Sequence, residues 1–329
     1  MKTDVLSSLI SNSKQIDASH SLQTHFDGIS DITLPHSSPN TLIASCFDTT
    51  LSIYDLTTYK ETSLLRGHSK GVWTCDAHPT TSTLVSGSND NTIIYWDIRS
   101  SQPIHHLKTH SNAIYDVQFS SNGRYFASCS KNTICIWDIN NLSKPIDTLT
   151  QNKDNNGFIY CINFFDNDSK VITGYVDGTV ILHAFNSNED DVMLSLKCDY
   201  PSYEQEELKY AKAVYAIHKF RNGKSNSIIL SHSDGSVRLF DIVGNTLKQK
   251  DAFYYFTSPV TCANCSLDDK RLIGCGKDRT AEIWKINTHS AIDYTLSGHR
   301  NIISACDFIN DNLVVTASYD CSIKLWTLT

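Results

Sequence analysis

The sequence has no apolar run long enough to cross a membrane, no block of basic residues, and no charged-then-apolar leader after Met1. The longest apolar runs are strand-sized, well short of the roughly 20 residues that a membrane helix needs. With 28 Lys and Arg against 35 Asp and Glu, the formal net charge is −7 and no stripe of positive charge is present. We therefore expect no membrane span and no direct contact with nucleic acid.

Clusters with metal-ligand spacing are also missing, although the chain has eleven cysteines. The only CxxC is Cys262-Ala263-Asn264-Cys265, whereas a zinc site needs four ligands, usually two such pairs or one pair plus histidines. The histidines, including His105-His106, are not arranged as ligands. The Gly-containing turns, such as residues 175–178, join strands and do not open helices, so no phosphate-binding loop is expected. We predict no metal and no cofactor, and we interpret Cys262 and Cys265 as structural residues.

The cysteines are scattered over the predicted strands, and their number is odd. Since no leader is apparent, this pattern indicates reduced thiols in a cytoplasmic or nuclear protein.

The sequence is dominated by one pattern that occurs seven times. Its clearest copy covers residues 65–97, where Gly67-His68 opens the copy, Ser86 and Asp90 lie near its end, and Trp96-Asp97 closes it. Three short runs with strand character lie between these markers. The turn positions that correspond to Asp90 are Asp48, Asp90, Lys131, Asp177, Asp234, Asp278 and Asp320. Their spacing is 41 to 46 residues, apart from 57 between Asp177 and Asp234, and a fixed period of this length is typical of repeat architectures.

This pattern resembles the WD-repeat family of seven-bladed β-propellers. The resemblance covers residues 16–329 and implies an all-β fold, a single propeller of four-stranded antiparallel blades. One such sheet cannot bury both faces alone, whereas neighbouring blades in a closed ring cover each other. The segment before His25 matches the outer strand that precedes other repeats, with Leu22 at the place of Leu296. The resemblance therefore implies that an N-terminal strand completes the last blade and closes the ring.

Two segments lie outside the regular pattern. Residues 1–15 are Ser-rich and are expected to form an extension before the propeller, either a short helix built on Val5, Leu6, Leu9 and Ile10 or a frayed terminus. Residues 198–213, in the long spacing before Asp234, are acidic and rich in tyrosine. They are either a functional arm or a tolerated surface insertion.

In the family, the His, Ser or Thr, Asp and Trp of a repeat form a buried hydrogen-bonded chain that holds the blade. The resemblance implies two complete sets here, which are His68, Ser86, Asp90 and Trp96 in blade 2 and His299, Thr316, Asp320 and Trp326 in blade 7. Blade 1 keeps His25 and Asp48 but has Ala44 and Tyr54; blade 3 keeps His110 and Trp137 but has Lys131 in a shortened turn; blades 4–6 lack the His.

A catalytic triad built from these residues is disfavoured. A triad needs an exposed nucleophile beside a base and an oxyanion hole, whereas these residues recur in a repeated frame. We expect the network to be structural, and we predict no catalytic residue.

The resemblance also implies a partner surface around the mouth of the central channel, where the loops before the inner strands and the Asp turns emerge together. Five places after the His position, four consecutive blades carry an aromatic residue: Trp73, Tyr115, Tyr160 and Tyr215. Trp and Tyr are enriched in interaction hot spots; the alternative is that these rings only pack the blade tops. Residues of the turns add Phe47, Asn89, Lys131, Lys277, Arg279 and Tyr319, and the cations among them suit an acidic peptide.

We therefore expect a non-catalytic scaffold or adaptor that binds a peptide or helix of a partner protein on this face, within a multiprotein complex. One alternative is a G-protein β-like signalling subunit, since residues 301–326 resemble repeats of those subunits, although their long N-terminal coiled-coil helix is absent. An enzyme that used the channel as a pocket would require clustered carboxylates or metal ligands at the top face, and none are apparent.

Overall fold

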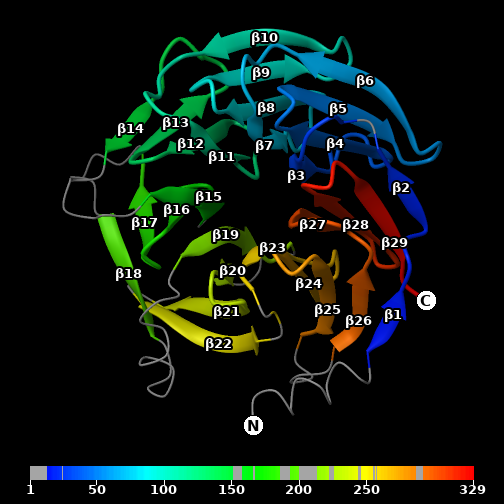
Figure 1. Ribbon diagram of the computed structural model, residues 1–329. Helices are drawn as coiled ribbons and strands as arrows, with labels where there is room; N and C mark the ends of the chain where they lie inside the picture. The colour runs from blue at the N-terminus through cyan, green and yellow to red at the C-terminus, as the bar shows by residue number, and fades with distance from the viewer. Residues whose placement is uncertain are drawn as a thin grey trace.

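The structure, a computed structural model, describes residues 13–23, 25–150, 158–165, 167–185, 193–199, 213–221, 226–243, 246–254, 256, 258–286 and 292–329, with the backbone alone for residues 193–199. Over these residues it contains 29 β-strands, which Figure 1 shows as seven blades in a ring around a central axis. The predicted all-β, seven-bladed propeller is confirmed. Within the same residues no helix has the length and hydropathy needed to cross a membrane.

Blades 1 to 3 are separate four-stranded antiparallel sheets, each running in chain order from the inner to the outer strand. Blade 1 consists of β3 (Ile29–Thr33), β4 (Thr41–Cys46), β5 (Thr50–Asp55) and β6 (Lys60–Arg66). Blade 2 consists of β7 (Val72–Ala77), β8 (Thr83–Ser88), β9 (Ile93–Asp97) and β10 (Gln102–Leu107). Blade 3 consists of β11 (Ile114–Phe119), β12 (Tyr125–Ser130), β13 (Thr133–Asp138) and β14 (Asp147–Thr150).

Blades 4 and 5 are joined at their outer edges. Blade 4 consists of β15 (Ile159–Phe165), β16 (Lys170–Tyr175), β17 (Val180–Ala184) and β18 (Met193–Asp199). Blade 5 consists of β19 (Val214–Lys219), β20 (Ser227–His232), β21 (Ser236–Val243) and β22 (Thr246–Tyr254). β18 pairs in parallel with β22, with Lys197 opposite Thr246, so the two blades form one eight-stranded sheet.

Blades 6 and 7 hold both ends of the described chain. Blade 6 consists of β23 (Val260–Cys265), β24 (Arg271–Gly276), β25 (Thr280–Lys285) and β26 (Ile292–Ser297). Blade 7 consists of β27 (Ile303–Asn310), β28 (Leu313–Ser318), β29 (Ile323–Thr327) and the N-terminal strand β2 (His20–Leu22). β2 runs antiparallel to β29, with Leu22 opposite Ile323, which confirms the predicted closure of the ring by an N-terminal strand.

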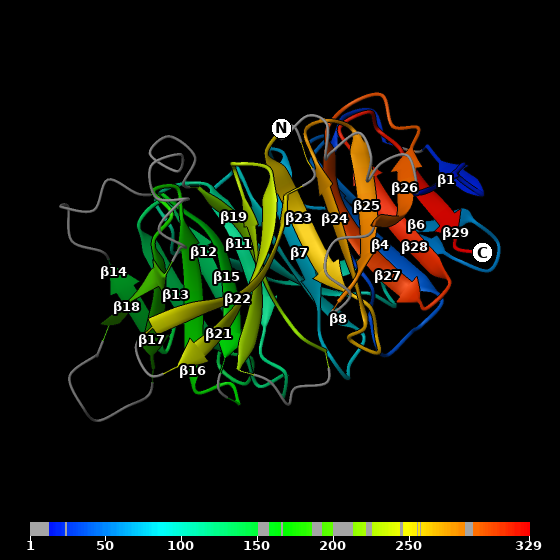
Figure 2. The same cartoon turned by 90° about the horizontal axis from the view of Figure 1, so that it is seen from below.

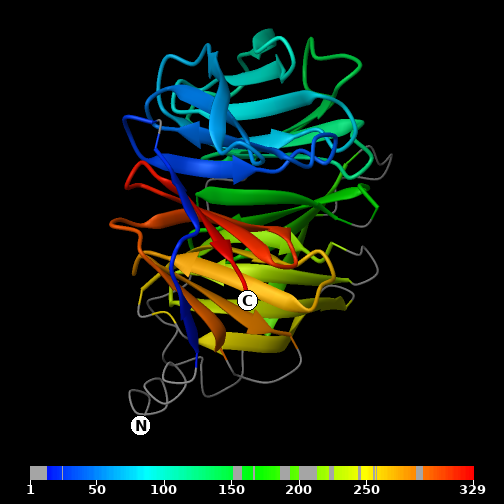
Figure 3. The same cartoon turned by 90° about the vertical axis from the view of Figure 1, so that its right-hand side faces the viewer.

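A second N-terminal strand, β1 (Lys14–Ile16), pairs in parallel with β26 and adds a fifth strand to blade 6. The Lys14 Nζ and the Tyr294 hydroxyl both donate to the carbonyl oxygen of Thr329, at 3.0 and 2.8 Å. The N-terminal segment therefore spans two blades and lies against the C-terminus (Figure 3). Residues 1–12, most of the predicted extension, lie outside the described residues.

The core is divided among the seams between blades. Seven clusters of buried apolar residues are present, and each draws residues from two adjacent blades. Figure 2 views the ring from its edge and shows neighbouring sheets side by side. Because each sheet is covered on both faces, middle strands such as β8 are buried along most of their length and lack the alternation of a half-exposed strand.

Candidate functional site

We define the top face as the side of the ring that carries the loops before the inner strands and the turns between the second and third strands of the blades. Backbone hydrogen bonds join these loops and turns. The amide of Asn89 donates to Gly71 O at 2.9 Å, and that of Tyr319 donates to Ile302 O at 2.9 Å. After the turn aspartate the next residue has a positive φ, as at Asn91 (68°) and Arg279 (71°). A type I turn that ends in a left-handed residue is a common hairpin connection.

A β-bulge lies at the same place in every inner strand. The pairing register skips one residue in each, namely Ser30, Trp73, Tyr115, Tyr160, Tyr215, Thr261 and Ser304. A bulge leaves the extra residue out of the ladder and changes the direction of its side chain. The four aromatic residues predicted to bind a partner therefore occupy positions that the fold removes from regular sheet pairing.

The structure brings these aromatic side chains into one continuous row. The centroid distances are 5.9 Å for Trp73–Tyr115, 5.6 Å for Tyr115–Tyr160 and 5.4 Å for Tyr160–Tyr215. Phe47 extends the row, with its ring 4.8 Å from Trp73 and 5.4 Å from Tyr319. We call this row the aromatic belt: Tyr319, Phe47, Trp73, Tyr115, Tyr160 and Tyr215. All six side chains are half-buried, so the rings pack on one another and still reach solvent.

The other three bulge positions carry small hydroxyl residues that connect blades. Ser30 Oγ donates to Val72 O at 2.7 Å, and Ser304 Oγ donates to Ile29 O at 2.6 Å. Thr261 Oγ1 likewise donates to Ile303 O. Each hydroxyl thus binds the inner strand of the next blade. In blades 2 to 5, aromatic residues of the belt occupy the bulge positions in place of these hydroxyls.

Two of the predicted cations lie over aromatic rings of the top face. Lys131 Nζ is 4.8 Å from the centroid of Phe158, and Lys277 Nζ is 5.6 Å from that of Tyr215. Both lysines and Arg279 are exposed. Cations over ring faces interact favourably with the ring quadrupole, and here they place positive charge beside the belt.

Two exposed aromatic residues of the top face escaped the sequence analysis. Phe26, which follows His25 in the loop before β3, is 96% exposed. Phe158, two residues before Tyr160, is 38% exposed and lies 6.5 Å from the ring of Tyr115. Both lie in loops, whereas the repeat pattern of the sequence marks positions in strands and turns. In the sequence, the signal for Phe26 is its position directly after the loop histidine His25.

The two complete polar sets form continuous hydrogen-bonded chains. In blade 2, Trp96 Nε1 donates to Ser86 Oγ at 2.8 Å, and Ser86 Oγ lies 2.8 Å from His68 Nε2. His68 Nδ1 lies 3.0 Å from Asp90 Oδ2. In a neutral imidazole the Nδ1–H donates to the carboxylate and Nε2 accepts the serine hydroxyl. Burial acts to raise the pKa of Asp90, but the hydrogen bonds from His68 and Thr92 outweigh it and hold the pKa well below its usual value.

Blade 7 repeats this arrangement with threonine in place of serine. Trp326 Nε1 donates to Thr316 Oγ1 at 2.8 Å, Thr316 Oγ1 lies 2.7 Å from His299 Nε2, and His299 Nδ1 lies 3.0 Å from Asp320 Oδ2. The hydroxyls and imidazoles of both sets are buried, so neither set offers an exposed nucleophile. The geometry is that of a structural link between loop, strand and turn.

Blade 3 lacks the aspartate end of this hydrogen-bonded network. His110 Nε2 lies 2.8 Å from Ser128 Oγ, but its Nδ1 is buried and has no hydrogen-bond partner among the described residues. The turn is one residue shorter and its Lys131 side chain lies over Phe158, away from this imidazole. Burial lowers the pKa of His110 to about 4.

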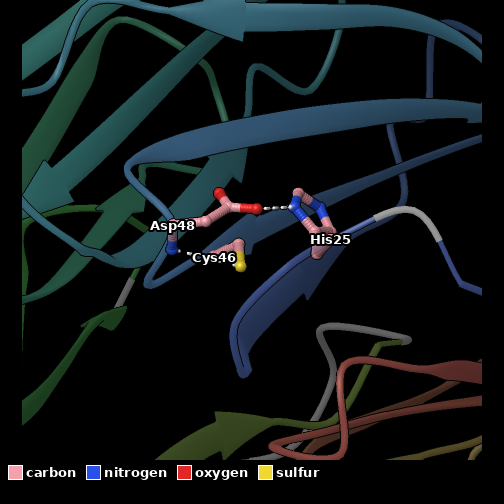
Figure 4. Close-up of side chains that lie close together, drawn as sticks. All are labelled: His25, Cys46 and Asp48. Atoms are coloured by element: carbon pink, nitrogen blue, oxygen red, sulfur yellow. Dashed lines mark hydrogen bonds and ion pairs between the residues drawn. The ribbon is translucent and has the colours of Figure 1, made fainter.

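Blade 1 lacks the opposite end of the network, the strand hydroxyl and the tryptophan. Ala44 replaces the hydroxyl residue, so His25 Nε2 is buried without a partner in the described structure, while Nδ1 lies 2.8 Å from Asp48 Oδ2. Cys46 is close to this pair, and the three side chains form a candidate group of metal ligands (Figure 4).

The residues of this group do not fit a metal. Cys46 Sγ donates to Asp27 O at 3.2 Å and accepts the Asp48 amide at 3.3 Å, as Ser88 Oγ donates to Gly71 O and accepts the Asp90 amide in blade 2. Burial raises the pKa of the Cys46 thiol, so a metal would have to displace a strongly held proton. The group is a variant of the blade network with cysteine in place of serine.

Blades 4 and 5 lack the loop histidine, and each carries another basic side chain in its network. In blade 4, His183 at the Trp position lies 3.0 Å, through Nε2, from Thr173 Oγ1. In blade 5, Arg238 of β21 binds the turn aspartate from within its own strand, with its Nη2 2.5 Å from Asp234 Oδ2. Arg238 is 1% exposed. A guanidinium thus takes the place of the loop imidazole.

Carboxylates gather on the inner strands, below the top face, where the sequence analysis did not identify them. The carboxylates of Asp31, Asp76 and Asp116 accept backbone amides of the next blade, namely those of Cys75 at 3.1 Å, Phe119 at 2.7 Å and Ile162 at 2.9 Å. Burial raises the pKa of Asp31 and Asp76 to about 7, and the charge of Asp31 contributes to the rise at Asp76. These hydrogen bonds satisfy backbone amides of the inner strand of the next blade, which is an edge strand of its sheet.

Cys262 and Cys265 are buried in β23. The cysteines described individually, ten in all, are free of disulfide bonds.

The repeated blades, the closed ring and the polar network define a WD-type β-propeller, and comparison with known families agrees. Six segments match the family described as WD40, WD domain, G-beta repeat; they are residues 17–55, 59–97, 101–138, 143–183, 249–285 and 291–327. Together they make up more than half of the chain. The chain belongs to the WD40 repeat family, whose fold is typically used as a protein-interaction scaffold. The strands β19, β20 and β21 of blade 5 lie outside the matched segments.

Curated relatives share parts of these repeats. Protein tipD of Dictyostelium discoideum is 29% identical over 107 residues, which cover 32% of this chain and 17% of that protein. The guanine nucleotide-binding protein subunit beta of Lymnaea stagnalis is 30% identical over 120 residues, which cover 35% of this chain and 33% of that protein. The denticleless protein homolog of Homo sapiens is 26% identical over 179 residues, covering 50% of this chain and 23% of its own length. The aligned region spans a third or less of each of these relatives.

Proposed function

We propose that this protein is a non-catalytic interaction scaffold whose top face binds a peptide or helix of a partner protein within a multiprotein complex. The observation that carries this function is the aromatic belt, in which six half-buried rings from six blades form one continuous surface at bulge and turn positions. Large aromatic side chains supply most of the binding energy in many protein interfaces. Trp73, Tyr115, Tyr160 and Tyr215 are its proposed anchors, and the protein acts in the cytoplasm or nucleus.

The absence of catalysis is part of the proposal. Among the described residues, the hydroxyls and imidazoles of the two complete networks and the carboxylates of Asp31, Asp76 and Asp116 form hydrogen bonds that join structural elements. An enzyme would need groups that face substrate, whereas the exposed side chains of the belt are aromatic.

Partner capture with a matched control tests the proposal. We expect the W73A/Y160A variant to lose partners that the wild type retains, with affinity falling by about 30-fold or more, since truncation of a hot-spot residue costs about 2 kcal/mol or more. The control variant I104A/L267A removes apolar side chains that are 45% and 42% exposed elsewhere on the molecule and should keep every partner. Unchanged capture by a folded W73A/Y160A variant would refute the site.

A G-protein β-like signalling subunit is the second candidate, favoured by the similarity to the Lymnaea stagnalis protein. It predicts that guanine nucleotide-binding protein subunits are among the captured partners, and their absence would remove it.

A further inference from the structure

In the described part of the top face, most of the exposed charged side chains are basic. Across its described loops and turns, exposed cations outnumber exposed acids by six to two, although the whole chain carries 28 basic and 35 acidic residues. The exposed cations are Lys70, Lys108, Lys131, Lys277, Arg279 and Arg300. The two exposed acids are Asp27 and Asp177.

The turn aspartates other than Asp177 also lie on this face, but they are engaged inside their blades. In five of them, Oδ1 accepts a hydrogen bond from the side-chain hydroxyl of the residue two places later, with O···O distances of 2.5 to 3.0 Å. The donors are Thr50, Thr92, Ser236, Thr280 and Ser322. Three also bind a buried histidine, and Asp234 binds Arg238. These carboxylates are directed into the protein, whereas the cations extend into solvent.

The contacts of Lys131 and Lys277 argue against a basic partner more strongly than the number of exposed cations does. Lys131 and Lys277 already occupy ring faces on and beside the belt, at 4.8 and 5.6 Å from the centroids. A cationic side chain of a partner would compete for those faces and meet like charge. A carboxylate can instead pair with either ammonium while apolar side chains contact the rings.

We infer that the partner segment of the top face is acidic, with aromatic or aliphatic residues that contact the belt and Asp or Glu residues beside them that pair with Lys131, Lys277 and Arg279. This inference rests on the proposed function, since it names the chemistry of the ligand for the same face. Complementary charge at such a surface sets partner choice and association rate. Because the cations are exposed, their contribution weakens as salt screens them.

The test uses two synthetic fluorescein-labelled peptides with the same Phe and Leu anchors, one with Glu and the other with Lys at the remaining positions. We expect the wild-type chain to bind the Glu peptide about tenfold or more tightly than the Lys peptide at low salt, and to lose this preference at high salt. The K131E/K277E variant should reverse the preference, and W73A/Y160A should weaken binding of both peptides. Circular dichroism and thermal unfolding establish that each variant is folded.

Other outcomes overturn the inference in distinguishable ways. Equal binding of both peptides, or tighter binding of the Lys peptide, with the effect of W73A/Y160A retained, would remove the acidic partner and leave the proposed function intact. Binding of neither peptide would also overturn the inference, while partner capture would still decide the proposed function. Self-association in sedimentation that W73A/Y160A abolishes would assign the belt to a second copy of the chain instead.

Discussion

The indole Nε1 of Trp73 donates a hydrogen bond to Asn89 Oδ1 at 2.7 Å. This bond joins the bulged residue of an inner strand to the residue before the turn aspartate, so the two structural features of the top face meet at one contact. The bond fixes the plane of the ring at the centre of the aromatic belt, between Phe47 and Tyr115. A preoriented ring loses less conformational entropy when a partner binds.

Trp73 should therefore be the residue that reports on the top face in fluorescence. The other four tryptophans, Trp96, Trp137, Trp284 and Trp326, are buried, so we expect acrylamide to quench mainly Trp73. The N89A variant should increase quenching, because the indole loses its partner, and should change the free energy of unfolding by less than about 1 kcal/mol, since water replaces the lost acceptor.

The W73F variant is the control for that measurement. It keeps an aromatic ring and should remove most of the quenchable signal. Equal quenching of W73F and wild type would show that a different tryptophan is accessible, and the described burial of the four others would then be wrong.

The incomplete network of blade 1 predicts a stabilising substitution. A44S places a hydroxyl where Ser86 stands in blade 2, and that hydroxyl would donate to the unpartnered His25 Nε2. We expect the free energy of unfolding to rise by about 0.5 to 1.5 kcal/mol, the net contribution of a typical hydrogen bond. Urea denaturation measures the change.

The opposite substitution in a complete network serves as its comparison. S86A should lower the free energy of unfolding by about 1 to 3 kcal/mol, because two buried groups, His68 Nε2 and Trp96 Nε1, lose their partner. Neither variant should alter partner capture. A destabilised A44S protein would show that blade 1 has no room for the hydroxyl.

The fold was predictable because every blade except blade 3, which carries Lys131, repeats the same turn chemistry. A turn aspartate followed by a hydroxyl or glycine and an alternating strand recurs at nearly constant spacing, and the match of Leu22 with Leu296 identified the closing strand. The parallel pairings of β1 with β26 and of β18 with β22 were not predictable in this way. They join edges of different blades, and the spacing within a repeat carries no information on contacts between outer edges.

The positions of the belt residues followed from counting along each repeat, but their mutual contacts did not. Contact depends on the bulge that redirects each side chain, and a bulge adds one residue without a sequence signature of its own. The partner of Asp234 was missed for a related reason. In the repeat pattern the partner of the turn aspartate is a histidine of the preceding loop, whereas the compensating cation, Arg238, comes from the following strand.

The pair of Asp234 and Arg238 predicts a strong effect of removing one member alone. In R238L the turn carboxylate loses its guanidinium partner in a buried position, and we expect a loss of about 3 to 5 kcal/mol in the free energy of unfolding. The double variant D234N/R238L removes both charges and should cost much less, because replacing a whole buried ion pair by neutral groups is often close to neutral. Denaturation of the two variants and of D234N completes a double-mutant cycle. Equal losses in R238L and the double variant would show that packing of the Arg238 stem, and not its charge, holds blade 5.

Glu282 of β25 predicts a dependence of stability on pH. It occupies in blade 6 the strand position that Arg238 occupies in blade 5, is 5% exposed, and has a buried Oε2 without a hydrogen-bond partner among the described residues. Burial, with a contribution from the charge of Asp278, raises the pKa of Glu282 from 4.5 to about 8. Since the folded pKa is the higher one, the native state binds the proton more tightly than the unfolded chain does. Its contribution to stability is complete below about pH 4.5 and is lost as the pH rises toward about 8, by up to about 1.4 kcal/mol per pH unit.

The E282Q variant lacks this titration and should be less sensitive to pH across that range. Buried histidines act in the opposite direction, since burial lowers the pKa of His110 and His183 to about 4 and acid must protonate them as the chain unfolds. The informative quantity is therefore the difference in free energy of unfolding between E282Q and wild type, which should grow in favour of E282Q as the pH rises. E61Q, which removes an exposed carboxylate, is the control variant. Parallel curves for E282Q and wild type would mean that Glu282 ionises in the native protein as it does in the unfolded chain, and that the buried position carries no charge penalty.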